Sequence, residues 1–177
     1  MKNIFLLFIL SAAFLLSSCG GSESAADIPE CGENPEFPCL DATSGFFWSE
    51  KTLNSKIWSE ALFYCENLEE GGIKNWRLPN IDELRTLVQD CYGTVTGGEC
   101  MVSDARGCLS YDLCWSTSCL CGFDENGKYS KFGDLGGFWS SSEAKGAEDG
   151  AWHINFYEAE IVDDHKQSSH SVRCVYN

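Results

Sequence analysis

The sequence predicts a single α+β domain in which two helices pack on short antiparallel sheets. Three observations lead to this fold class: two amphipathic helical patterns come first, four short strand-like runs close the chain, and a cysteine-rich stretch without a regular period separates them. The chain has 177 residues, so once a short leader is set aside it has the length of one globular domain.

Residues 1–18 have the pattern of a signal peptide. A short positive leader precedes an apolar run at residues 4–16, which is too short to span a bilayer. The sequence Leu-Ser-Ser-Cys-Gly at residues 16–20 resembles the lipobox of bacterial lipoproteins, which implies cleavage before Cys19 and acylation of that cysteine. Ordinary cleavage near Ser18, without a lipid, is the alternative.

The lipid anchor sets the expected location of the protein. Several acyl chains on Cys19 would hold the mature chain on its membrane, and Gly20 resembles the sorting signal for the bacterial outer membrane. Residues 19–38 are therefore interpreted as the lipidated N-terminus and a flexible linker, since residues 20–30 are small and polar. We expect an exported protein, lipid-anchored to the cell envelope, whose folded domain occupies residues 39–177.

The first elements of this domain are a strand and a helix. Residues 46–48 follow a Ser-Gly turn and form a short aromatic run that predicts a strand. From Ile57 the apolar side chains recur at helical spacing, and Gly71 with Gly72 ends the pattern. The apolar stripe expected to face the core consists of Trp58, Ala61, Leu62, Cys65 and Leu68.

A second helix is predicted directly after Pro79. Asn80 and Glu83 stand at the N-cap and N3 positions of a capping box. The apolar face of this helix consists of Ile81, Leu84, Leu87 and Val88. Residues 91–135 then contain six cysteines, many glycines and no sustained period, which predicts an irregular region held by crosslinks.

Four short runs predict the strands that close the chain, at residues 137–142, 151–156, 160–163 and 171–176. In the second run, alternation places Trp152 and its apolar neighbours on one face and His153 on the other. We therefore expect His153 at the surface.

Composition narrows the classes of partner. The chain has 27 acidic residues against 12 Lys and Arg, a net charge of -15, and no basic run. Nucleic acid is not expected as a partner, because phosphate binding needs the opposite charge. The 11 cysteines form no repeated CxxC pairs, which favours an oxidising compartment, and setting Cys19 aside leaves an even number for pairing.

Several motifs, taken in order, resemble the Lcl C-terminal domain family. They are GFFW at 45–48, WSEA at 58–61, YCENL at 64–68, WRLPNIDEL at 76–84, FWSSS at 138–142, AW at 151–152 and VRCV at 172–175. The resemblance implies a C-type lectin-like fold, in a bacterial family that is often found on lipoproteins and is largely of unknown function. Residues 91–135 depart from the pattern and resemble a cysteine-rich insertion.

The resemblance also implies a disulfide between Cys65 and Cys174, because C-type lectin-like domains join their first helix to their last strand. Such a bridge would contribute about 4 to 5 kcal/mol through chain entropy. Cys31 with Cys39 is the simplest local pair. The other cysteines would then bond among themselves: Cys91, Cys100, Cys108, Cys114, Cys119 and Cys121.

An enzyme is the alternative to a binding protein. The formylglycine-generating enzymes share this fold and an Arg-Leu-Pro run, similar to residues 77–79, and they bind copper through two cysteines separated by four residues. Cys114 and Cys119 have that spacing, although the family's pair lies near the C-terminus. Arg77 has a simpler interpretation as a structural residue that ties the second helix down through Glu83 or Asp82.

No other catalytic or metal pattern is convincing. No serine has a nucleophile-elbow pattern, and no catalytic residue is assigned. Calcium has two weak candidate clusters, one with Asp163 and Asp164 in the late strands and the other at residues 124–127, and neither is a complete site. The sugar-binding motifs of calcium-dependent lectins are absent.

We therefore expect a non-catalytic domain that binds a glycan or an envelope or extracellular protein. Loops on a rigid scaffold carry function, so the contacts are expected from the insertion. Trp115 is the one tryptophan outside the family motifs and is the candidate stacking platform, with Asp112 beside it. A purely structural role in the envelope is a third possibility.

Overall fold

The computed structural model describes residues 28–32 and 35–177 of the chain. The expected signal peptide, Cys19 and most of the expected linker lie outside these residues. Within them, no helix is both long and apolar enough to cross a membrane. The elements are β1 (Cys39–Asp41), β2 (Phe46–Trp48), α1 (Trp58–Glu66), α2 (Ile81–Arg85), α3 (Tyr111–Cys114), the 3-10 turn η1 (Thr117–Cys119), β3 (Gly137–Glu143), β4 (Gly150–Asn155), β5 (Glu160–His165) and β6 (Val175–Tyr176).

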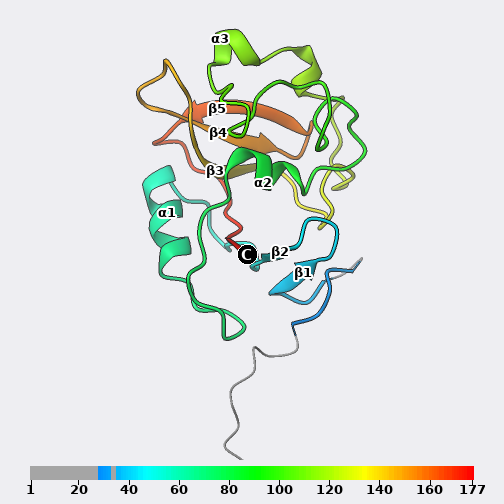
Figure 1. Ribbon diagram of the computed structural model, residues 1–177, viewed down its shortest axis with the longest axis vertical. Coiled ribbons are helices and arrows are strands. Elements are labelled where there is room, and N and C mark those ends of the chain that lie inside the picture. Colours follow the sequence, from blue (N-terminus) through cyan, green and yellow to red (C-terminus); the bar gives the residue numbers. More distant parts are fainter. Residues whose placement is uncertain (1–27, 33–34) are drawn as a thin grey trace, which may run out of the picture.

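Two small antiparallel sheets organise the domain, as the α+β prediction requires (Figure 1). The first has the order β1-β2-β6, so its outer strands come from the two ends of the domain. The second has the order β3-β4-β5, with an irregularity in β3 between Trp139 and Glu143. In Figure 1, α1 lies beside the sheets, α2 lies below the larger sheet, and α3 lies above it.

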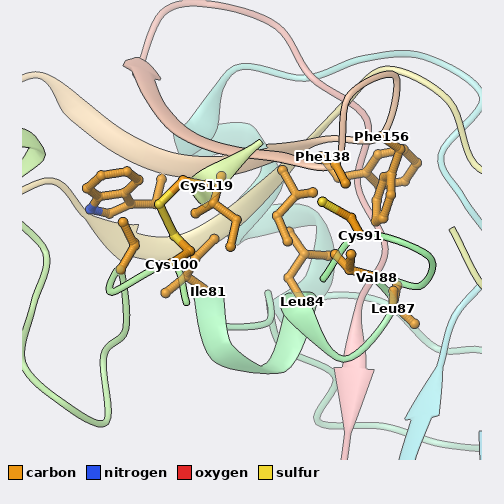
Figure 2. Close-up of a cluster of buried hydrophobic side chains, with 14 of the residues drawn as sticks. Ile81, Leu84, Leu87, Val88, Cys91, Cys100, Cys119, Phe138 and Phe156 are labelled. Carbon is orange, nitrogen blue, oxygen red and sulfur yellow. A yellow bond between two sulfur atoms is a disulfide. The ribbon is translucent and has the colours of Figure 1, made fainter. Parts of the chain in front are cut away.

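The core consists of two apolar clusters. The larger one packs α2 against the β3-β4-β5 sheet, and Figure 2 shows Ile81, Leu84 and Phe138 within it. The smaller one packs α1 against Trp76 and Trp139. Trp48, Trp76, Trp139 and Trp152 are at most 2% exposed, as expected for core positions. Trp58 is half-buried, and its indole nitrogen donates a hydrogen bond to the Ser140 carbonyl at 2.8 Å.

Local sequence signals set where the helices begin. α2 begins at the predicted capping box: Asn80 Oδ1 accepts from the Glu83 N–H at 2.9 Å, and the Glu83 carboxylate accepts from the Asn80 N–H at 2.8 Å. The predicted apolar face of this helix extends to Val88, whereas α2 ends at Arg85. Leu87 and Val88 still reach the core from the turns that follow.

Two arginines tie the framework together. Arg77 makes a bidentate contact with Glu83, at 2.5 and 2.7 Å, so the structural interpretation of Arg77 is confirmed. Arg173 is buried and donates two hydrogen bonds to Asp134, at 2.8 and 2.9 Å. Its guanidinium also donates to the Ser49 carbonyl, which links the chain before β6 to the segment after β2.

Two disulfides hold the ends of the domain. Cys65 of α1 bonds Cys174, which directly precedes β6, and this bridge closes 109 residues. Cys31 bonds Cys39 at the start of β1. Both pairs are those expected from the sequence analysis.

The structure corrects three expectations about the strands. His153 is only 6% exposed rather than at the surface, because both faces of the β3-β4-β5 sheet contribute side chains to core clusters. The closing strand is limited to Val175–Tyr176, since Ser171 bonds to β3 while Val172 and Cys174 bond to the segment after β2. The sequence analysis missed β1, because a strand of three residues is too short to show a recognisable alternation.

Candidate functional site

Residues 91–135, which the sequence analysis interprets as an insertion and which keep that name below, are crosslinked among themselves. Its six cysteines form the pairs Cys91–Cys121, Cys100–Cys119 and Cys108–Cys114. Figure 2 shows the Cys100–Cys119 bridge lying against the core beside Ile81. Cys114 and Cys119, the pair with copper-site spacing, are therefore bonded to different partners and present no thiolate pair.

A buried arginine organises the first half of the insertion. Arg85, at the end of α2, is 3% exposed and donates hydrogen bonds only to backbone carbonyls. Its acceptors are Gly93, Thr94, Cys100 and Val102, at 2.7 to 3.2 Å. Burial, followed by the positive charge of Arg106, lowers the pKa of Arg85. One side chain thus fixes the path of about ten loop residues, and no sequence pattern indicated this role.

Polar contacts attach the middle of the insertion to the sheet. Asp82 of α2 accepts from the Ser103 hydroxyl at 3.1 Å and from the Ala105 N–H at 2.9 Å. Ser142 of β3 donates to the Asp104 carboxylate and accepts from the Ile81 N–H. The insertion is therefore held by covalent and polar contacts on the side that faces the fold.

The outer side of the insertion carries exposed apolar side chains. Within the part of the chain that the structure describes, seven large apolar side chains are exposed, and five of them belong to residues 91–135. These five are Tyr92, Met101, Tyr111, Leu113 and Phe123. Side chains exposed in this way are available to contact a partner.

The short helix α3 borders a surface hollow of about 480 Å³. The hollow lies between α3, the turn that joins β3 to β4, and the edge strand β5; its lining includes Tyr111, Asp112, Ala147, Val162 and Asp163. It therefore joins the predicted ligand residue Asp112 to the weak calcium candidate Asp163, which lie 51 positions apart in the sequence.

Tyr111 contributes one wall of the hollow and is paired with a second aromatic ring, Trp115. The rings of Tyr111 and Trp115 are stacked, with centroids 5.2 Å apart and planes 15° apart. Trp115 packs against the larger core cluster and its indole nitrogen is buried, whereas Tyr111 is 40% exposed. Tyr111 is thus the more exposed ring of the pair, and Trp115, the expected platform, lies against the core.

The two carboxylates of the hollow lack a cationic partner among the residues that the structure describes. Within residues 28–32 and 35–177, neither Asp112 nor Asp163 takes part in an ion pair or accepts a side-chain hydrogen bond. Lys145 also lines the hollow, but its ammonium group donates to the Gly107 carbonyl at 3.2 Å. Burial, followed by the charges of Asp164 and Asp112, raises the pKa of Asp163.

The comparison with protein families gives one finding. The sequence model of the Lcl C-terminal domain matches residues 39–176. This chain belongs to the Lcl C-terminal domain family. The search of curated proteins found no match.

In this Lcl C-terminal domain, the second calcium candidate is already engaged. The Asp164 carboxylate accepts from the His165 N–H at 2.6 Å and from Ser168 Oγ at 3.0 Å, and it lies 2.9 Å from His170 Nε2. Among the described residues, no group of three or more His, Cys, Asp or Glu side chains is arranged to hold a metal ion. Asp163 and Asp164 also point to opposite faces of β5, as alternation requires.

Proposed function

We propose that this member of the Lcl C-terminal domain family is a membrane-anchored bacterial lipoprotein with a non-catalytic ligand-binding domain. Its ligand is a glycan or a protein of the envelope or its surroundings. The observation that carries this proposal is the concentration of exposed apolar side chains on the crosslinked insertion. A rigid loop surface loses little conformational entropy when it binds, which favours recognition.

The placement of the insertion supports an outward-facing binding surface. The described chain begins beside β1, at one end of the domain, and α3 lies at the opposite end (Figure 1). An acyl anchor on Cys19 would therefore attach the end of the domain that is remote from α3. Loops held at the far end of a tethered scaffold can reach partners beyond the membrane surface.

The binding proposal is tested on arrays of glycans and purified envelope proteins. The wild-type domain is compared with a variant in which Tyr92, Met101, Tyr111, Leu113 and Phe123 are replaced by serine. Wild type should bind at least one component, and the variant should lose it while unfolding at an unchanged temperature. The matched control replaces the exposed Leu53 and Phe63, which lie outside the insertion, and should bind normally. Absence of any binding by the wild type would refute the proposal.

The anchor is tested separately in the expressing cell. Mass spectrometry of the mature N-terminus should find acyl chains on Cys19. The Cys19→Ser variant should move from the membrane fraction to the soluble fraction, because its hydrophobic attachment is lost. A wild-type chain that is soluble and unacylated would remove the lipoprotein part of the proposal and leave the binding part standing.

A further inference from the structure

The hollow beside α3 has the composition of a carbohydrate subsite. It offers one exposed aromatic ring, from Tyr111, and two carboxylates, from Asp112 and Asp163, on facing walls. Sugar rings present C–H faces that pack on aromatic rings, and their hydroxyls donate hydrogen bonds to carboxylate oxygens. Small side chains such as Ala147 leave room between these walls.

The aromatic wall is already in its binding position. Trp115 covers one face of the Tyr111 ring, and Trp115 itself packs into the larger core cluster. The Cys108–Cys114 disulfide closes the segment that leads into α3. Because the ring is stacked from beneath, a ligand would not have to order it, which reduces the entropy lost on binding.

The charge of the hollow selects among saccharides. Its two carboxylates are not neutralised by lysine or arginine in the described part of the chain, and the only lysine of the lining donates to a backbone carbonyl. Sulfate and uronate groups would be repelled by these carboxylates. Burial raises the pKa of Asp163, but the carboxylate keeps its lone pairs as acceptors for hydroxyl donors.

We infer that the hollow between α3 and β5 binds an uncharged saccharide, with Tyr111 stacked on the sugar ring and Asp112 and Asp163 accepting hydrogen bonds from its hydroxyls. This inference rests on the proposed ligand-binding function and names its site and ligand class. It requires no calcium, because the contacts are made by side chains directly.

The test uses the complete mature domain and an array of immobilised oligosaccharides, some neutral and some sulfated or uronate-bearing. Neutral oligosaccharides should bind, and titration with the best of them should give an affinity that added salt leaves unchanged. Tyr111→Ala and Asp163→Asn should each weaken binding at least tenfold. Tyr111→Phe should retain most of it, because the ring and its stack remain. Leu53→Ala is the control, since Leu53 is exposed outside the insertion and does not line the hollow.

Each other outcome overturns the inference in a recognisable way. Binding restricted to sulfated or uronate-bearing sugars would refute the ligand class. If Tyr111→Ala and Asp163→Asn left the binding of neutral sugars unchanged, the site would be refuted. Binding to a protein but to no saccharide would refute the inference and leave the proposed function intact. A domain that binds neither would remove both. If Tyr111→Ala failed to fold, Asp163→Asn together with Tyr111→Phe would still decide the result.

Discussion

Acid should destabilise this domain through one buried histidine. His153 lies on β4, stacked on His170 with ring centroids 4.1 Å apart, and Trp139 meets it edge-on. Its Nδ1 atom is buried and has no hydrogen-bond partner in the described part of the chain. Burial, followed by the charge of His170, lowers the pKa of His153 from 6.5 to about 3. The other ionisable group against this pair is Asp164, 2.9 Å from His170 Nε2.

The sign and size of the effect follow from proton linkage. Between pH 6.5 and about 3, the unfolded chain binds a proton at His153 that the folded chain does not. Stability therefore falls as the pH decreases through this window, and the effect is absent above it. At about 1.4 kcal/mol per pH unit, the loss reaches about 3 kcal/mol by about pH 4.5 and about 5 kcal/mol below the folded pKa.

Urea unfolding at neutral pH and at about pH 4.5 measures this effect. The variant His153→Phe keeps a flat ring in the stack and removes the titrating group, so its acid-induced loss should be smaller than that of wild type by about 2 to 3 kcal/mol. His165→Gln is the matched control, because the His165 side chain is 58% exposed. Equal losses in wild type and His153→Phe would refute the reasoning, whatever the stability of the variant at neutral pH.

Three further changes test the framework. Arg85→Met should lower the free energy of unfolding by about 2 to 4 kcal/mol, since buried carbonyls lose their donor. Arg85→Lys should show a smaller loss of stability, and thermal unfolding measures both variants. Asp134→Ala should cost about 3 to 5 kcal/mol by the same measurement, because it leaves the buried Arg173 charge with only the exposed Glu50 carboxylate, 4.0 Å away. Removing both Cys108 and Cys114 should cost about 2 kcal/mol, and hydrogen exchange should rise in α3 while the core sheet stays protected.

The parts of the fold that sequence analysis predicted well are those with a local or family signal. The capping box at Asn80 and Glu83 fixes the start of α2 through contacts three residues apart. The Cys65–Cys174 pairing came from the family's motif positions and not from spacing. Both kinds of signal are independent of where loops run in space.

The parts that it missed depend on how distant segments meet. Alternation on β4 identifies one apolar face but does not show that the other face is covered as well, and so His153 was misplaced. Arg85 bonds only to carbonyls, which every residue possesses, so no residue type in residues 93–102 marks its partners. Tyr111 and Trp115 are four residues apart, and only their packing shows which of them is exposed.

The same contacts explain how an insertion of this kind can change its surface without endangering the fold. Arg85 takes its acceptors from main-chain carbonyls, and the disulfides join cysteines of the insertion to one another, so neither depends on the side chains that face solvent. Tyr92, Met101 and Leu113 therefore contribute little to the stability of the framework, because side chains that remain exposed bury little apolar area. Substitutions at these positions would change what the domain binds before they change whether it folds, which is the property that a recognition loop requires.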